Sequence, residues 1–163
     1  MLTNVSAFTR EYNGYSKRLE TEANIEYKGN TVKVNALWDT GATNTCISTD
    51  VVSSLNLVPL GKQQIRTPSG AITVNTFMVD ILLPNNVIAK NVAVCDSEIG
   101  KQNLGVLIGM DIICLGDFSV SNFNKKTVFT FRTPSQKKTD YVAEANLTKA
   151  IGPIHGKGKR KRR

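Results

Sequence analysis

The sequence predicts an all-β domain of barrel or sandwich type. Two observations lead to this class: short segments of alternating apolar and polar residues follow one another through residues 19–132, and turn-forming residues separate them. With 163 residues, 40% of them apolar and 21% charged, the chain can bury a core without a disulfide or a metal. The expected organisation is an N-terminal extension (1–18), the β domain (19–132), a linker and helix (133–152) and a disordered basic tail (153–163).

Local patterns predict the individual elements. Residues 1–18 are polar and are expected to be irregular. Alternating apolar residues on both sides of Lys28-Gly29-Asn30 indicate a hairpin, and Thr67-Pro68-Ser69-Gly70 is a turn signal between the arms of another. Further strands are expected at 44–48, 62–66, 71–77, 77–83, 87–94, 104–108 and 128–131, and short helical turns at 50–55 and 110–115.

A change of composition after Thr133-Pro134 predicts a C-terminal helix. Asp140 can cap this helix, and Gly152-Pro153 ends it. One face carries its apolar residues, which are Ala143, Leu147, Ala150 and Ile151. We therefore expect the helix to pack on the domain or on a second copy of the chain.

The net charge of +8 is concentrated in the last seven residues. Outside them, 15 basic residues face 13 acidic ones, so the body of the chain is nearly neutral. The six basic residues of the tail are Lys157, Lys159, Arg160, Lys161, Arg162 and Arg163. Such a run could bind nucleic acid or another polyanion, act as a targeting signal, or serve only as a solubilising end.

The cysteine and histidine content indicates neither a structural metal nor a disulfide framework. No two cysteines have CxxC spacing, and the one histidine, His155, lies in the tail. Cys46 and Cys114 have apolar neighbours and are expected in the core, whereas the sequence does not decide the location of Cys95. The sequence implies no cofactor. It shows no secretory signal and no apolar stretch long enough to cross a membrane, so we expect an intracellular, cytoplasmic protein.

The segment with the clearest chemistry is Asp39-Thr40-Gly41, which follows the apolar residues 36–38. A carboxylate at a strand end, held by backbone donors, can act as a general acid or base. Gly41 allows a backbone N–H to approach it, because no Cβ intervenes. The tripeptide alone is also typical of an ordinary strand-end turn, and Trp38 before it is expected to be a core residue.

Two further segments occur in a consistent order with this motif. The hairpin around residues 67–70 follows it, and an apolar strand ending in Gly109 comes next. Together, ALWDTGATNTCIS, the hairpin around TPSG, and VLIGMDII resemble the active-site strand, flap and second loop of retropepsin-like aspartic proteases. The resemblance covers roughly residues 19–132. It implies an acid-protease half-lobe built as a closed β-barrel, with a flap hairpin, one short helix after the second loop and an extra C-terminal helix.

The resemblance also assigns roles to individual residues. Asp39 would be catalytic, and Asp111 would support its own loop. Thr43 and Met110 stand where retroviral members often carry an acid and an arginine, so a different dimer surface is implied. The remaining implied site residues are Thr40, Gly41 and Ala42 as active-site support, Thr67, Pro68, Ser69 and Gly70 in the flap, and Ile108 and Gly109 in the second loop.

Aspartic proteolysis needs two carboxylates around one water, one ionised and one protonated. The sequence has a single Asp-Thr-Gly, so a two-fold homodimer is the simple way to build the pair. The leading hypothesis is a homodimeric aspartic endopeptidase acting on polypeptides. The alternative is a non-catalytic dimerisation or peptide-binding module of the same fold. Apolar residues expected near the cleft are Ala36, Ile72, Val74, Val106 and Ile108.

Overall fold

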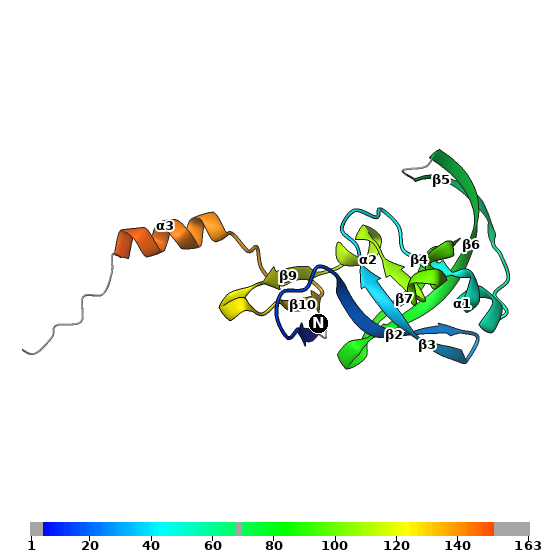
Figure 1. The fold of residues 1–163 in the computed structure, drawn as a ribbon, viewed down its shortest axis with the longest axis horizontal. Coiled ribbons are helices and arrows are strands. Elements are labelled where there is room, and N and C mark those ends of the chain that lie inside the picture. The colour runs from blue at the N-terminus through cyan, green and yellow to red at the C-terminus, as the bar shows by residue number, and fades with distance from the viewer. Residues whose placement is uncertain (1–4, 68–69, 152–163) are drawn as a thin grey trace, which may run out of the picture.

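A closed barrel of six strands forms the body of the computed structural model, which describes residues 5–67 and 70–151. The strand order is β2-β3-β8-β4-β7-β6, and pairing of β6 with β2 closes the ring (Figure 1). The all-β barrel predicted from the sequence is therefore confirmed. The barrel strands are β2 (Leu19–Tyr27), β3 (Asn30–Trp38), β4 (Cys46–Ser48), β6 (Gly70–Leu83), β7 (Val87–Ser97) and β8 (Val106–Ile108).

The hairpin of β2 and β3 forms as its sequence predicts. Lys28 and Gly29 both have positive φ, 50° and 82°, as a tight two-residue hairpin turn requires. The resulting register fixes which side chains enter the barrel, because alternate residues point to opposite faces of a strand. Ala23 and Ile25 are buried on one face, and Ala36 and Trp38 continue the core along β3.

A second sheet closes one end of the barrel, in the order β1 (Ser6–Glu11), β10 (Val128–Thr133) and β9 (Asp117–Ser121). The expectation that residues 1–18 are irregular was wrong for β1, and β9 was not anticipated. One face of β1 is exposed and polar, which hides the strand signal. Its Phe8 nevertheless packs against Trp38, with 5.6 Å between ring centroids.

Trp38 is buried, as the sequence predicts, at the centre of an aromatic cluster between the two sheets. Its ring centroid lies 5.1 Å from that of Phe129 and 5.0 Å from that of Phe131. Its indole Nε1 donates to Thr21 Oγ1 at 3.0 Å. The strand that delivers Asp39 is therefore anchored at its last residue by stacking and by a buried hydrogen bond.

Short helices connect the strands. Helix α1 (Thr49–Ser54) begins at Ser48, whose Oγ accepts from Val51 N, and α2 (Met110–Ile113) follows β8. Both agree with the expected helical turns. Cys114 caps α2 and is exposed, so its expected core position was wrong. The 3₁₀ turns are η1 (Pro84–Asn86), η2 (Glu98–Gln102) and η3 (Phe123–Lys125).

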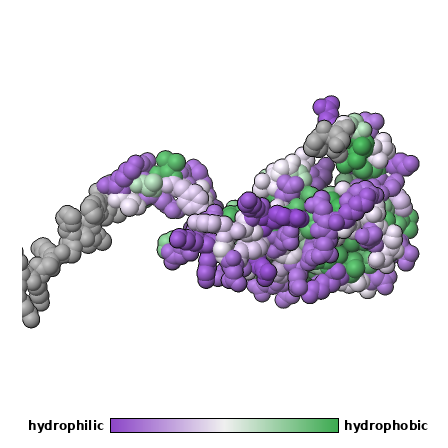
Figure 2. Space-filling model, viewed as in Figure 1, coloured by the Kyte–Doolittle hydropathy of each residue, from purple (hydrophilic) through white to green (hydrophobic). Residues whose placement is uncertain are grey.

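Helix α3 (Tyr141–Ile151) forms where the sequence predicts it, with Asp140 Oδ1 accepting from Val142 N and Ala143 N, both at 3.1 Å. It does not pack on the domain, which was one of the two expectations, but projects away from it (Figure 1), and packing on a second copy of the chain stays a prediction. Leu147 is 63% exposed, and Figure 2 shows apolar surface on α3 far from the barrel. No helix among the described residues is long and apolar enough to cross a membrane.

Asp117, at the start of β9, ties the chain beyond β10 to the second sheet. It accepts hydrogen bonds from Ser135 Oγ at 2.5 Å and Gln136 N at 2.9 Å, and it pairs with Arg132. These donors, first Ser135, then Gln136 and Arg132, hold the pKa of Asp117 well below its usual range. Ordered contacts with the domain thus continue to Gln136.

Candidate active site

Asp39 lies at the end of β3, at the point where the chain leaves the barrel. Strands β3 and β8 are parallel neighbours, and Asp39 N donates to Ile108 O at 2.9 Å, which extends their pairing by one residue. Gly41 N then donates to Asp39 Oδ1 at 2.8 Å. A Cβ on Gly41 would lie 3.2 Å from this oxygen, so glycine lets the backbone approach closely. The carboxylate is half-buried and held by its own turn.

The loop after β8 supports the loop after β3 through a buried threonine. Thr45 is fully buried, and its N and Oγ1 donate to Asp111 at 2.9 and 2.7 Å. Its Oγ1 also accepts from Gly109 N at 3.0 Å, and Ile112 N donates to Asp111 at 2.9 Å. Sequence reasoning missed Thr45, although a hydroxyl residue beside the buried β4 was a usable signal.

The two loops also touch through their backbones. Met110 N donates to Ala42 O at 2.8 Å, and Asp111 N donates to Thr43 O at 3.2 Å. A Cβ on Gly109 would lie 2.6 Å from the Asn44 carbonyl carbon, which is closer than real contacts allow. Backbone hydrogen bonds therefore join the two loops at Thr43 and Met110, the two positions at which this sequence carries neither the acid nor the arginine of an ion pair.

A long hairpin stands over this region. Strand β5 (Gly61–Thr67) pairs with the outer half of β6, with Ile65 opposite Ile72, and the pair arches away from the barrel (Figure 1). Gly70 has a φ of 120°, which suits glycine at the return of the chain. Pro68 and Ser69 of the expected flap lie outside the described residues, as do all six basic residues of the tail.

A cleft of about 390 Å³ lies between the Asp39 loop and β5. Ala36, Val106 and Ile108 do not line it, contrary to expectation, because they are fully buried in the barrel. Leu107 points the other way, as alternation along a strand requires, and does line it. The lining residues are Gly41, Ala42, Thr43, Asn44, Cys46, Gln64, Ile65, Arg66, Cys95, Ser97 and Leu107.

A second hollow, of about 470 Å³, adjoins Asp39 and Thr40 on the side of β9. Its apolar lining includes Leu37, Phe118 and Val120, of which Val120 is 37% exposed. The Thr40 side chain is itself exposed. The Asp39-Thr40-Gly41 motif thus lies between two hollows, one under the hairpin and one beside the second sheet.

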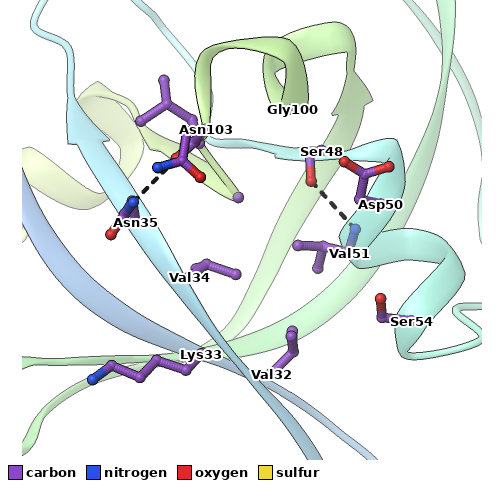
Figure 3. A pocket seen from close by; sticks show the side chains of 12 residues that line it. Val32, Lys33, Val34, Asn35, Ser48, Asp50, Val51, Ser54, Gly100 and Asn103 are labelled. Atoms are coloured by element: carbon purple, nitrogen blue, oxygen red, sulfur yellow. Dashed lines mark hydrogen bonds between the residues drawn. The ribbon is translucent and has the colours of Figure 1, made fainter.

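A third cavity, of about 420 Å³, lies away from Asp39 between β3, α1 and η2 (Figure 3). It is lined by Val34 and Val51 together with Asp50 and Lys33. Asn35 Nδ2 donates to the Asn103 carbonyl oxygen across its rim at 3.2 Å. None of the residues expected in the catalytic site lines this cavity. The described residues hold no group of three or more His, Cys, Asp or Glu side chains suited to a metal ion.

This fold resembles that of solved aspartic proteases. A retropepsin-like aspartic protease from Rickettsia conorii matches 82% of this chain and 98% of its own, with 12% identity and a TM-score of 0.54. The protease of EIAV, solved with the inhibitor HBY-793, matches 63% of this chain and 89% of its own, with 25% identity and a TM-score of 0.47. The likeness to the Rickettsia conorii protein shows that the fold is that of a retropepsin-like half-lobe.

Sequence comparison identifies the family. Residues 25–114, more than half of the chain, match the gag-polyprotein putative aspartyl protease family. No curated protein matches the sequence significantly. The chain therefore belongs to this aspartyl protease family, and the matched segment contains Asp39, the hairpin and the second loop.

Proposed function

We propose that this protein is an aspartic endopeptidase that works as a homodimer, with Asp39 of each subunit forming the catalytic pair. The observation that carries the proposal is the state of the Asp39 carboxylate. Within the described part of the chain it accepts one hydrogen bond, from Gly41 N, so lone pairs remain for a water and a second carboxyl. It also lies next to a cleft that can receive a peptide.

Among the described residues, the loops after β3 and β8 supply no second carboxylate for the pair. Asp111 is the other aspartate of the two crossing loops, but both of its oxygens accept hydrogen bonds from the protein. Proteolysis by this chemistry needs two carboxyls close enough that they cannot both ionise. A two-fold axis beside Asp39 supplies the second carboxyl from an identical subunit.

We place the second subunit against the hollow on the β9 side. Strand β9 is the last strand of its sheet, and its outer edge has no strand partner among the described residues. Phe118 and Val120 on this strand, with Leu37 beside them, form an apolar surface next to Thr40. A two-fold contact there would cover β9, bury the Thr40 side chains and bring the two Asp39 residues together.

In the resulting site each group has a defined task. One Asp39 is ionised and takes a proton from the attacking water, while the other is protonated and donates to the carbonyl oxygen of the scissile bond. The peptide lies as an extended strand between the Asp39 loops and the β5–β6 hairpin. Closing of the hairpin excludes solvent water and holds the peptide in register.

Subunit mixing tests the proposal. Wild-type protein and Asp39→Asn are unfolded together, refolded at varied ratios, and assayed for cleavage of a denatured protein at mildly acid pH. If both subunits must supply Asp39, activity follows the square of the wild-type fraction, so an equal mixture retains about one quarter. A linear dependence on that fraction would refute the shared pair.

The same samples address the non-catalytic alternative. Wild-type protein that dimerises and binds an unfolded polypeptide, yet leaves it intact across the acid range, would be a binding module of this fold. Sedimentation gives the oligomeric state, and mass spectrometry of the polypeptide gives the products.

A further inference from the structure

Two of the three cysteines lie side by side on neighbouring strands. Cys46 in β4 and Cys95 in β7 are direct partners in the parallel pairing of these strands. Paired residues project from the same face of a sheet, and neighbouring strands lie about 4.7–4.9 Å apart. This separation falls within the range of about 4.4–6.8 Å that disulfides span between Cα atoms. The backbone thus places the two thiols where a disulfide can form.

The two thiols already interact in the reduced protein. A hydrogen bond between them lowers the pKa of Cys95 and raises that of Cys46, with burial raising the latter further. We assign Cys46 as the donor, because its S–H stabilises a thiolate at Cys95. The neighbouring carboxylates Asp96 and Asp111 oppose the negative charge, and Ser97 favours it at Cys46. Cys95 is therefore the more nucleophilic sulfur of the pair.

Both cysteines line the cleft under the β5–β6 hairpin, where Cys46 is half-buried and Cys95 is 4% exposed, so a reaction at the pair requires a reagent as small as a peroxide that reaches them through the cleft. Cys114 differs in each respect. It caps α2, is exposed, and shares no strand pairing with another cysteine in the described chain. It provides an internal control for general thiol reactivity.

We propose that Cys46 and Cys95 form a redox-active dithiol in the wall of the cleft, which a peroxide oxidises to an intrachain disulfide. The Cys95 thiolate attacks a peroxide oxygen, the O–O bond breaks, and Cys95 becomes a sulfenic acid as hydroxide leaves. The Cys46 sulfur then attacks the sulfenic sulfur, forming the S–S bond and releasing water. Overall, two thiols and hydrogen peroxide give one disulfide and two waters. An added dithiol then reduces the disulfide to the two thiols by exchange and is itself oxidised to a cyclic disulfide.

The disulfide would act on the catalytic loop, a consequence that rests on the proposed protease function. Cys46 directly follows Thr45, whose side chain holds Asp111 and Gly109, and Cys95 N donates to Thr45 O at 3.4 Å. A covalent S–S bond draws β4 towards β7 next to this network. We expect the oxidised protein to cleave peptides several-fold more slowly, and the dithiol to restore the rate.

The experiment uses full-length protein carrying Cys114→Ser, so that Cys46 and Cys95 are the only thiols. After treatment with a small excess of hydrogen peroxide, we expect both free thiols to disappear together and a non-reducing digest to contain the Cys46–Cys95 linked peptides. The matched control carries Cys46→Ser and Cys95→Ser and keeps Cys114. Its single thiol should react without forming an intrachain link. A second control carries Cys95→Ala and Cys114→Ser and keeps Cys46, in case the variant with Cys46→Ser and Cys95→Ser does not fold.

The readouts separate the possible failures. Thiols that stay free, oxidise singly to sulfinic acid, or link only between chains would overturn the redox pair, whatever the activity. A disulfide that forms while the cleavage rate stays unchanged would overturn its effect on the catalytic loop. If no sample cleaves peptides even when reduced, the proposed protease function fails, and the linked digest still decides whether the dithiol exists.

Discussion

The loops after β3 and β8 begin as near equivalents and end with different tasks. Their strands are parallel neighbours, and each loop carries a glycine and an aspartate within three residues of its strand end. Among the described residues, the Asp111 carboxylate accepts three hydrogen bonds, from Thr45 and Ile112, whereas Asp39 accepts one from its own turn. A carboxylate whose acceptor sites are filled by the protein holds structure, and one with free acceptor sites can do chemistry.

Substitution of Asp39, the carboxylate that has free acceptor sites, should have the largest effect on activity. Asp39→Asn preserves shape but cannot take a proton from water, so we expect peptide cleavage to fall by about 10²–10⁴-fold or more. The free energy of unfolding should change by less than about 0.5 kcal/mol, because the Gly41 N contact is retained. Peptide cleavage and urea unfolding of the same preparation measure both. Retained cleavage would remove Asp39 from the catalytic role.

The other loop should show the reverse pattern. Asp111→Ala removes the acceptor of three hydrogen bonds and leaves the buried Thr45 hydroxyl and N–H without it. We expect the free energy of unfolding to fall by about 3 kcal/mol. Urea unfolding monitored by Trp38 fluorescence would measure the loss.

The cleavage rate of the folded fraction of Asp111→Ala is then compared with that of Asp39→Asn. If Asp111 acts only by holding the loops, that fraction keeps far more activity than Asp39→Asn. A variant as stable as the wild type, yet inactive, would instead place Asp111 in the chemistry and break the distinction between the loops.

The two glycines extend the comparison to the backbone. A Cβ on Gly109 would meet the Asn44 backbone, whereas one on Gly41 would meet the Asp39 carboxylate, a movable side chain. We therefore expect Gly109→Ala to cost about 2–4 kcal/mol of stability, and Gly41→Ala to cost less than about 1 kcal/mol. Gly41→Ala should still lower kcat by about tenfold or more, because it displaces the Asp39 carboxylate, which takes part in the proposed mechanism. Equal losses of stability would contradict this assignment.

Sequence patterns predicted much of the barrel for a physical reason. Strand β2 and the first part of β3 alternate apolar and polar residues, and the Lys28-Gly29 turn fixes their register, so local residues determine the structure. Strands β1 and β9 are partly exposed and pair at long range with β10, so their stability depends on partners that no local pattern reveals. The same limit explains why the sequence motif suggested Asp39 as a site residue, whereas no local motif singled out Thr45, which is buried by tertiary contacts.

The lining of the cleft shows a second limit. Ala36 shortly precedes the Asp39 motif, and Val106 and Ile108 shortly precede Gly109, but all three apolar residues face the barrel interior. The choice of face depends on one residue of register, and that register is set by the pairing of β3 with β8. Polar residues such as Gln64 and Arg66 reach the cleft from β5 instead. Any account of substrate preference therefore has to begin from these side chains.

The smallest effect is expected at the C-terminal end of the domain. Truncation after Gln136 removes α3, whose residues 141–149 are exposed, and keeps the contacts of Asp117 with Ser135 and Gln136. We expect cleavage to be nearly unchanged and stability to change by less than about 0.5 kcal/mol. Loss of dimerisation would show that α3 binds the second subunit. Weaker retention on heparin would be consistent with the polyanion role expected for the basic tail.

A second variant that ends three residues earlier, at Thr133, provides the matched control and a test of pH dependence. It also removes Ser135 and Gln136, whose hydrogen bonds depress the pKa of Asp117 in the folded state. A depressed carboxyl pKa stabilises the fold above the unfolded pKa, and this contribution disappears as pH falls through the folded value. The shorter protein should therefore be less stable than the longer one at neutral pH, and the gap should narrow in acid. Thermal unfolding of both proteins between neutral and strongly acid pH measures the gap, and a gap independent of pH would show that these donors stabilise the fold by other means.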